Sequence, residues 1–143
     1  MFAPVVRCLL ACLAPALLVS PVLAEEVSIE HKGLALLGSL EVADGASLAQ
    51  DGAVLLVHGT LAHHRMEIMA TLQALLKERG LNSLAITLSL GLDRRQGMYD
   101  CGLTHRHRHS GAQAEIAAWV AWLQARGAGA ITLLGHSRGG NQA

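Results

Sequence analysis

The residues best suited to chemistry are the serine and its neighbours in the motif Gly135-His136-Ser137-Arg138-Gly139. A serine with a glycine two positions away on each side is typical of a nucleophile held on a tight turn between a strand and a helix. Such a turn leaves no room for side chains at the glycine positions. It also directs the next backbone amide toward negative charge that develops at the serine. The motif therefore predicts nucleophilic acyl transfer.

Two other interpretations of this turn are a plain strand–helix connection and a phosphate-binding loop. A phosphate loop needs the pattern G-x-x-x-x-G-K-[ST], or G-x-G-x-x-G at the strand–helix turn. The first pattern is absent and the second does not occur at this turn. The apolar run that ends at the motif is the strand that a nucleophile requires, so the nucleophile is favoured over both alternatives.

A second glycine turn supports this interpretation. His58-Gly59-Thr60 follows another apolar run, earlier in the chain. Acyl-transfer enzymes of this kind take their second oxyanion donor from the end of an earlier strand. The candidate donors are the backbone amide of Thr60, or of Leu61, together with the amide of Arg138. Two amides from two strand ends would then hold one oxyanion.

Apolar runs and glycine turns predict the elements that position these residues. Strands are expected at 27–31, 34–42, 53–57, 81–90 and 130–134, and helices at 65–79 and 111–126, with a further helix beginning at Gly140. The helices carry apolar stripes, Ile68, Leu72, Leu75 and Leu76 in the first and Ile116, Trp119, Val120 and Leu123 in the second. Strand–helix–strand units imply parallel strands with right-handed crossovers. We expect an α/β sheet with helices on both faces.

The stretch from Val54 to Ala143 contains VLLVHG, a helix, a strand, a helix and ITLLGHSRGG, and this order resembles the α/β-hydrolase fold superfamily. The resemblance implies a serine hydrolase that cleaves ester, thioester or amide bonds, or lipids, and needs no cofactor. Its partner would be a small-molecule acyl substrate. The resemblance makes Ser137 the nucleophile and the backbone amides of Thr60 and Arg138 the oxyanion hole.

The rest of the catalytic triad is not found. In this superfamily the acid and the histidine follow the nucleophile, but residues 138–143 contain no Asp, Glu or His. We therefore expect residues 25–143 to be the N-terminal part of an α/β-hydrolase domain, inactive as this chain. Its sheet would be incomplete, with about five mostly parallel strands, two helices and the start of a third. A rearranged triad of His58 with Asp93 or Asp100 is less favoured, because a base must lie within hydrogen-bond reach of the serine.

Residues 1–24, MFAPVVRCLLACLAPALLVSPVLA, predict a signal peptide. A basic residue, Arg7, precedes the apolar run Cys8–Val19, which is shorter than the roughly 20 residues of a membrane span. Small residues then precede Glu25, as signal peptidase requires. The protein is therefore expected to be exported, to the periplasm or the medium, with no stable membrane span after cleavage. An uncleaved anchor and lipoprotein cleavage before Cys12 are the alternatives.

The composition excludes several classes. A length of 143 residues fits one domain. A formal net charge of zero argues against nucleic-acid binding, which needs a basic excess. Aromatic residues make up only 3%, too few for base stacking. Three cysteines do not make a disulfide scaffold, and Cys101, which would remain after signal cleavage, is expected to be buried.

The long loop before the second predicted helix is rich in histidine, since His105, His107 and His109 alternate with Arg106 and Arg108. Residues two apart on an extended chain lie about 6–7 Å apart. One metal ion, with bonds near 2 Å, would need the chain to bend. An exported metal-binding module is therefore a less favoured function, beside a non-catalytic binding protein of the same fold. A further hypothesis is that the two arginines contact an anionic substrate.

Overall fold

The computed structural model describes residues 24–104 and 107–143. The predicted signal peptide at 1–24 lies outside the described residues apart from Ala24, as do His105 and Arg106. In chain order the elements are β1 (Glu25–His31), β2 (Leu34–Glu41), α1 (Leu48–Asp51), β3 (Ala53–Val57), α2 (Glu67–Glu78), β4 (Ser83–Thr87), α3 (His109–Ala125), β5 (Ile131–Gly135) and η1 (Ser137–Asn141), a 3-10 helix. No helix in the described ranges is long and apolar enough to cross a membrane.

All five predicted strands are present, and the two long helices fall where the apolar stripes placed them. The strand expected at 81–90 is shorter, because only Ser83–Thr87 pairs with its neighbours. The short helix α1 was not predicted. It begins after Ser47, whose side chain accepts the Gln50 N–H at 3.2 Å and so satisfies one of the free amides of the first turn.

The strands form one mixed sheet in the order β1-β2-β4-β3-β5. β2 is antiparallel to both β1 and β4, whereas β3 is parallel to both β4 and β5. Only β2 therefore runs against the other strands, which confirms the expected mostly parallel sheet. The hairpin between β1 and β2 turns at Lys32 and Gly33, both with positive φ, as a two-residue hairpin turn requires.

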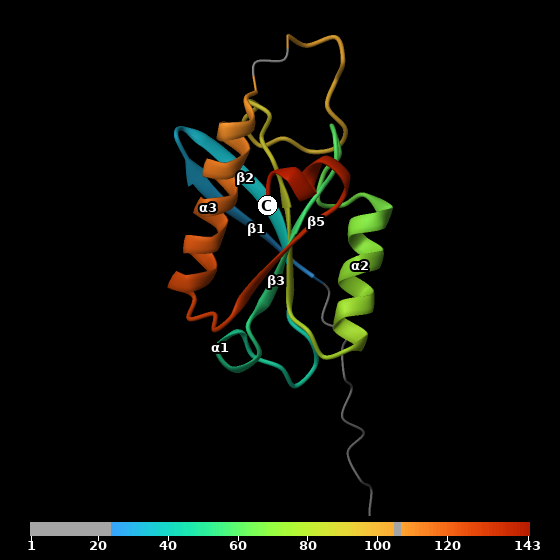
Figure 1. Ribbon diagram of the computed structural model, residues 1–143, viewed down its shortest axis with the longest axis vertical. Helices are drawn as coiled ribbons and strands as arrows, with labels where there is room; N and C mark the ends of the chain where they lie inside the picture. Colours follow the sequence, from blue (N-terminus) through green and yellow to red (C-terminus); the bar gives the residue numbers. More distant parts are fainter. Residues whose placement is uncertain (1–23, 105–106) are drawn as a thin grey trace, which may run out of the picture.

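The two long helices cover opposite faces of the sheet (Figure 1). On one face, Leu55 and Ile86 pack in the main core with Trp119 of α3. On the other face, Leu56 packs in a smaller core with Met69 of α2. Alternate residues of β3 therefore enter different cores, as expected for a strand covered on both sides. The predicted layering is confirmed.

Two of the four positions predicted for the apolar stripe of α2 are confirmed, because Leu72 and Leu76 pack against the smaller core, and the other two are wrong. Ile68 and Leu75 are each 41% exposed, while Met69 and Gln73 are buried against the sheet. The buried face includes a glutamine because its side-chain amide donates to the Ser39 carbonyl oxygen at 2.9 Å. A buried polar group is tolerated when it is hydrogen-bonded in this way, and a count of apolar residues cannot detect it.

Strand β5 is more exposed than the sequence predicted. It lies at one edge of the sheet and pairs only with β3 in the described part of the chain. Leu133 on β5 is consequently 42% exposed, although the strand consists largely of apolar residues. In contrast, the stripe of α3 is confirmed, because Ile116, Trp119 and Leu123 are buried.

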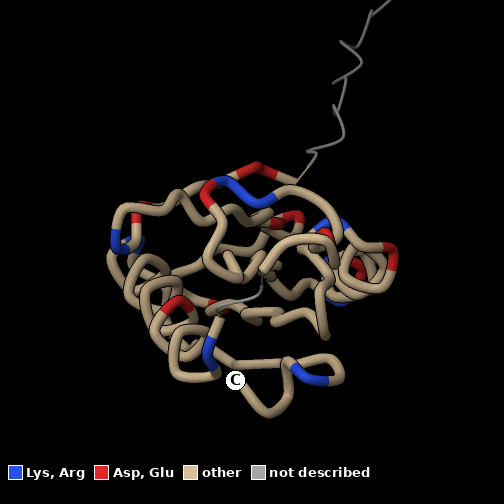
Figure 2. The backbone as a smooth tube through the Cα atoms, turned by 90° about the horizontal axis from the view of Figure 1, so that it is seen from above, with Lys and Arg blue, Asp and Glu red and all other residues tan. Residues whose placement is uncertain are grey.

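Charged positions are spread around the molecule (Figure 2). Seen from above, Lys and Arg positions lie among Asp and Glu positions along its rim. This agrees with the balance of eleven basic and eleven acidic residues in the sequence.

Candidate active site

Ser137 lies at the sharp turn between β5 and η1. Its φ of 55° is in the left-handed region, which costs a non-glycine residue about 1–3 kcal/mol. A side chain on Gly135 would overlap the backbone of Gly139 and Gly140, and one on Gly139 would lie 2.6 Å from the His58 carbonyl oxygen. Packing therefore requires both glycines of the motif. The short helix begins at Ser137 itself, three positions before the helix that the sequence predicted.

The end of β3 packs directly against this turn. The amide of His136 donates to the Val57 carbonyl oxygen at 2.9 Å. A Cβ on Gly59 would lie 3.1 Å from the Cβ of Ser137, a tight contact that would require the turn to shift by a few tenths of an ångström. The structure thus brings together the two glycine turns that carry Thr60 and Ser137.

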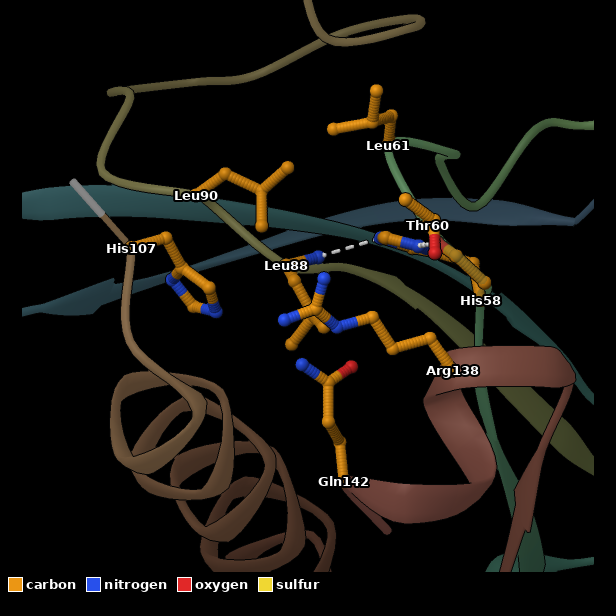
Figure 3. Close-up of a pocket in the computed structure, with 9 residues that line it drawn as sticks. His58, Thr60, Leu61, Leu88, Leu90, His107, Arg138 and Gln142 are labelled. Atoms are coloured by element: carbon orange, nitrogen blue, oxygen red, sulfur yellow. Dashed lines mark hydrogen bonds between the residues drawn. The ribbon is translucent and has the colours of Figure 1, made fainter. Parts of the chain in front are cut away.

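A hollow lies beside this junction, between the ends of β3 and β4, the loop before α3 and the start of η1 (Figure 3). Its lining consists of His58, Gly59, Thr60, Leu61, Leu88, Leu90, His107, Arg138 and Gln142. Thr60 and Arg138 both contribute to the lining, and Ser137 immediately precedes Arg138. The three residues singled out from the sequence therefore meet at one corner of the molecule.

His58 is fully occupied by structural hydrogen bonds. Its Nε2 accepts the Leu88 N–H at 3.0 Å and lies 3.1 Å from Nη2 of Arg95. The proton is therefore on Nδ1, which lies 2.6 Å from the Gly59 carbonyl oxygen and donates to it. Burial in the protein interior lowers the pKa of His58 to about 4, so the ring is neutral at neutral pH.

The carboxylates of the rearranged triad are also engaged elsewhere. Oδ1 of Asp93 accepts the Ala35 N–H at 2.8 Å, and Oδ1 of Asp100 accepts the Gly102 N–H at 2.8 Å. Neither carboxylate is recorded in a hydrogen bond with His58, whose Nδ1 already faces a carbonyl oxygen. The described residues therefore do not assemble the alternative triad, because its histidine has no ring nitrogen available to take a proton from the serine.

Arg95 holds the loop that follows β3, a role that no sequence pattern predicted. The side chain is 5% exposed. It donates to the carbonyl oxygens of Leu88 at 2.7 Å, Gly97 at 2.8 Å and Ala62 at 2.5 Å, and Nη2 faces His58. Burial lowers the pKa of Arg95 to about 10, which still leaves it charged at neutral pH. An arginine in a loop is usually solvated, so only its long-range partners reveal this role.

A second buried ionisable residue, Glu115, connects α3 to the end of β4. Its side chain is 6% exposed. Oε2 accepts the Ser89 N–H at 2.7 Å, and Oε1 accepts the Ser89 hydroxyl at 2.5 Å. A carboxylate with two hydrogen bonds at one residue fixes the start of the long loop relative to the helix.

The histidines outside the hollow do not form a metal site in the part of the chain that the structure describes. His64 is buried, with Nδ1 2.5 Å from the Thr87 hydroxyl and Nε2 3.2 Å from Glu26. Burial is the main cause that lowers its pKa. His109 is the first residue of α3, and Arg108 is its cap.

Cys101 is exposed, so the expectation that it is buried was wrong. It follows Asp100, whose carboxylate holds a tight local turn that directs the next residues outward. Cys101 lines an open hollow together with Leu61, Tyr99 and Leu103, and Arg138 closes the side next to the nucleophile turn. This hollow therefore adjoins the one beside the nucleophile turn, since both are lined by Leu61 and Arg138.

No family model matches the chain, and no curated protein matches it. Several solved structures do match. Est1E from Butyrivibrio proteoclasticus has a TM-score of 0.64 at 19% identity, over 82% of this chain and 42% of Est1E. A cold-adapted esterase from an Arctic intertidal metagenomic library has a TM-score of 0.64 at 26% identity, over 83% of this chain and 52% of the esterase. The thioesterase domain from the curacin biosynthetic pathway has a TM-score of 0.62 at 19% identity, over 84% of this chain and 39% of the domain.

The chain therefore has the α/β-hydrolase fold, which all three of these esterases and thioesterases share. The match confirms the fold that the motif order implied. The chain covers 42% of the first structure and 52% of the second, so it spans about half of such a hydrolase. Its five-strand sheet corresponds to an incomplete α/β-hydrolase sheet.

Proposed function

We propose that this chain belongs to an exported serine hydrolase of ester, thioester or amide bonds, in which Ser137 is the nucleophile. The amides of Thr60 and Arg138 form its oxyanion hole. The observation that carries the proposal is the strained turn at Ser137, held by two glycines that accept no side chain and packed against Gly59. The similarity to esterases and a thioesterase supports an acyl substrate.

The chemistry follows from this geometry. The Ser137 hydroxyl attacks the substrate carbonyl carbon, and the C–O, C–S or C–N bond to the leaving group breaks after a tetrahedral intermediate. Amides at the two strand ends stabilise the negative oxygen of that intermediate. Water then releases the acyl group and restores the serine. A general base must first remove the hydroxyl proton, and His58 cannot serve because both of its ring nitrogens are engaged.

We propose that the catalytic acid and histidine lie beyond residue 143, so that the 143-residue chain by itself lacks turnover. The test compares this chain with the protein extended in frame along its coding sequence. The extended protein is expected to hydrolyse a short-chain p-nitrophenyl ester and to react with a fluorophosphonate, and the Ser137→Ala variant to do neither. Ser137-dependent turnover by the 143-residue chain would contradict the need for further residues. An extended protein that is folded but unlabelled would point to a non-catalytic binding protein.

We further propose export through cleavage after Ala24, which would leave Glu25 as the first residue and β1 as the first element. The motif in residues 1–24 supports this, because small residues precede the cut and a short apolar run precedes them. N-terminal sequencing of the protein recovered from the periplasm or the medium is expected to begin at Glu25. Recovery from the cytoplasm with residues 1–24 intact would contradict it.

A further inference from the structure

Gln142 is a buried polar residue with an unused side chain. It is 5% exposed, and its carboxamide makes no hydrogen bond with the residues described here. Figure 3 shows the carboxamide directed into the hollow, toward the guanidinium of Arg138. The carboxamide is not one of the fully buried unpaired groups of the described residues, so its atoms reach the open space of the hollow. The side chain is therefore suited to receive a polar ligand.

The guanidinium of Arg138 lies in the same hollow and is also unpaired. None of the ion pairs or hydrogen bonds in residues 24–104 and 107–143 involves its side chain, whereas Arg65, for example, pairs with Glu26 at 2.8 Å. The residues that line the hollow include no Asp or Glu. The neighbouring His58 is neutral, because burial lowers its pKa to about 4. An arginine next to the nucleophile thus faces a space without a counter-charge.

A carboxylate matches these two side chains. It accepts hydrogen bonds only, and a planar guanidinium can donate two of them in parallel while a carboxamide donates a third. The guanidinium begins from Arg138, whose own amide is the proposed oxyanion donor, so the bound carboxylate and the reacting carbonyl are separated by about one arginine side chain. The groove lined by Leu61, Tyr99 and Leu103 adjoins the same arginine and offers apolar surface for carbon atoms.

We infer that Arg138 and Gln142 form a subsite that binds a carboxylate at the far end of the substrate's acyl group. The preferred substrates are then half-esters or half-thioesters of short dicarboxylic acids. This inference rests on the proposed function for the reaction itself. The anion subsite can be measured without any turnover.

The kinetic test uses the extended protein and two esters of equal length, mono-p-nitrophenyl glutarate and p-nitrophenyl pentanoate. The wild type is expected to prefer the anionic ester in kcat/KM. Arg138→Gln is expected to lower the ratio of the two kcat/KM values about tenfold to a hundredfold, the range for losing a charge-assisted hydrogen-bond pair. Gln142→Leu is expected to lower it about tenfold, the lower end of the range for one hydrogen bond to a charged group. Arg79→Gln, which removes the same charge on α2, is the matched control and is expected to keep the wild-type ratio.

The binding test uses the 143-residue chain with monomethyl glutarate as the anion and dimethyl glutarate as its neutral counterpart. NMR signals of the Arg138 guanidinium and the Gln142 carboxamide are expected to shift with the monoester only, and Arg138→Gln to abolish the Gln142 shift. Equal shifts with both compounds, or a kinetic ratio that Arg138→Gln leaves unchanged, would overturn the subsite. If the anion binds but the extended protein hydrolyses neither ester, the subsite stands and the proposed hydrolase reaction fails.

Discussion

His58 and Arg95 form one buried polar unit beneath the candidate oxyanion hole. His58 receives two N–H groups on Nε2, and Arg95 spreads its remaining donors over carbonyl oxygens of the loop after β3 and of the loop after β4. Nη2 of Arg95 donates a hydrogen bond to Nε2 of His58, so each side chain supplies the other with a hydrogen-bond partner. In a low-dielectric interior such a network is rigid when it is complete and costly when one member is lost. The network therefore ties the loop that carries Thr60 to the loop after β4.

The first prediction concerns Arg95. Arg95→Met keeps an unbranched side chain but leaves the carbonyl oxygens of Leu88, Gly97 and Ala62 without their donors. We expect a loss of about 2–4 kcal/mol in the free energy of unfolding, the range for unsatisfied partners of a buried charge. Amide hydrogen exchange at 58–62 should quicken more than exchange in β4. Arg94→Met at the exposed neighbouring position is the control, and unchanged exchange at 58–62 in Arg95→Met would show that Arg95 does not hold the loop.

The second prediction concerns pH and His58. Because its folded pKa is about 4 and its unfolded pKa is near 6.5, the unfolded state binds more protons between these values. The contribution of His58 to the free energy of unfolding is therefore fully present above about pH 6.5. This contribution is lost as the pH falls toward 4, and the loss amounts to up to about 3 kcal/mol. Buried His64 adds a loss in the same direction, because its pKa is lowered too.

Chemical denaturation across this pH range measures the effect. The slope of stability against pH should be smaller in His58→Asn, whatever the variant loses in absolute stability, and smaller again when His64→Asn is added. A slope identical to the wild type in both variants would show that these histidines are not the groups that titrate.

At the scale of elements, local sequence patterns predict the strands and the long helices. They do not predict the hydrogen bonds that join these elements to one another. The glycine spacing around Ser137 predicts the tight turn, because the backbone of Gly139 and Gly140 crowds Gly135 locally; the crowding of Gly139 by the end of β3 is long-range. Runs of apolar residues likewise locate β3 and α3. The sequence analysis did not predict three buried polar side chains, those of Gln73, Arg95 and Glu115. Each is buried because it forms hydrogen bonds with residues from other segments of the chain. Sequence patterns report local geometry well and long-range hydrogen bonding poorly.

The third prediction tests how Glu115 joins α3 to the sheet. Glu115→Ala removes a carboxylate that accepts both the amide and the hydroxyl of Ser89, so we expect unfolding to become easier by about 2–4 kcal/mol. Glu115→Gln keeps the shape and one acceptor and should lose less. Thermal unfolding measures both variants, with Glu78→Gln at the end of α2 as the control. If Glu115→Ala and Glu78→Gln behave alike, the carboxylate does not fasten the helix.

For the whole molecule, the β5 edge of the sheet leaves apolar side chains exposed. β5 is an edge strand in the described residues, and its Leu133 shares an apolar hollow with Ile116 and Val120 of α3. An edge strand of mostly apolar residues presents free backbone N–H and C=O groups to other chains. This edge, rather than the charged rim, is where the 143-residue chain would associate with a second copy.

The fourth prediction follows from this edge. The 143-residue chain is expected to associate with rising concentration, and Leu133→Lys to reduce that association because a charge at an exposed edge opposes strand pairing. Met98→Lys is the matched control, since Met98 is 59% exposed but lies in a loop, so the same charge there should leave association unchanged. Sedimentation velocity measures the oligomers. Cys101→Ser is used as the common background, because an exposed thiol can join two chains by a disulfide. If both lysine variants reduce association equally, net charge and not the β5 edge controls it.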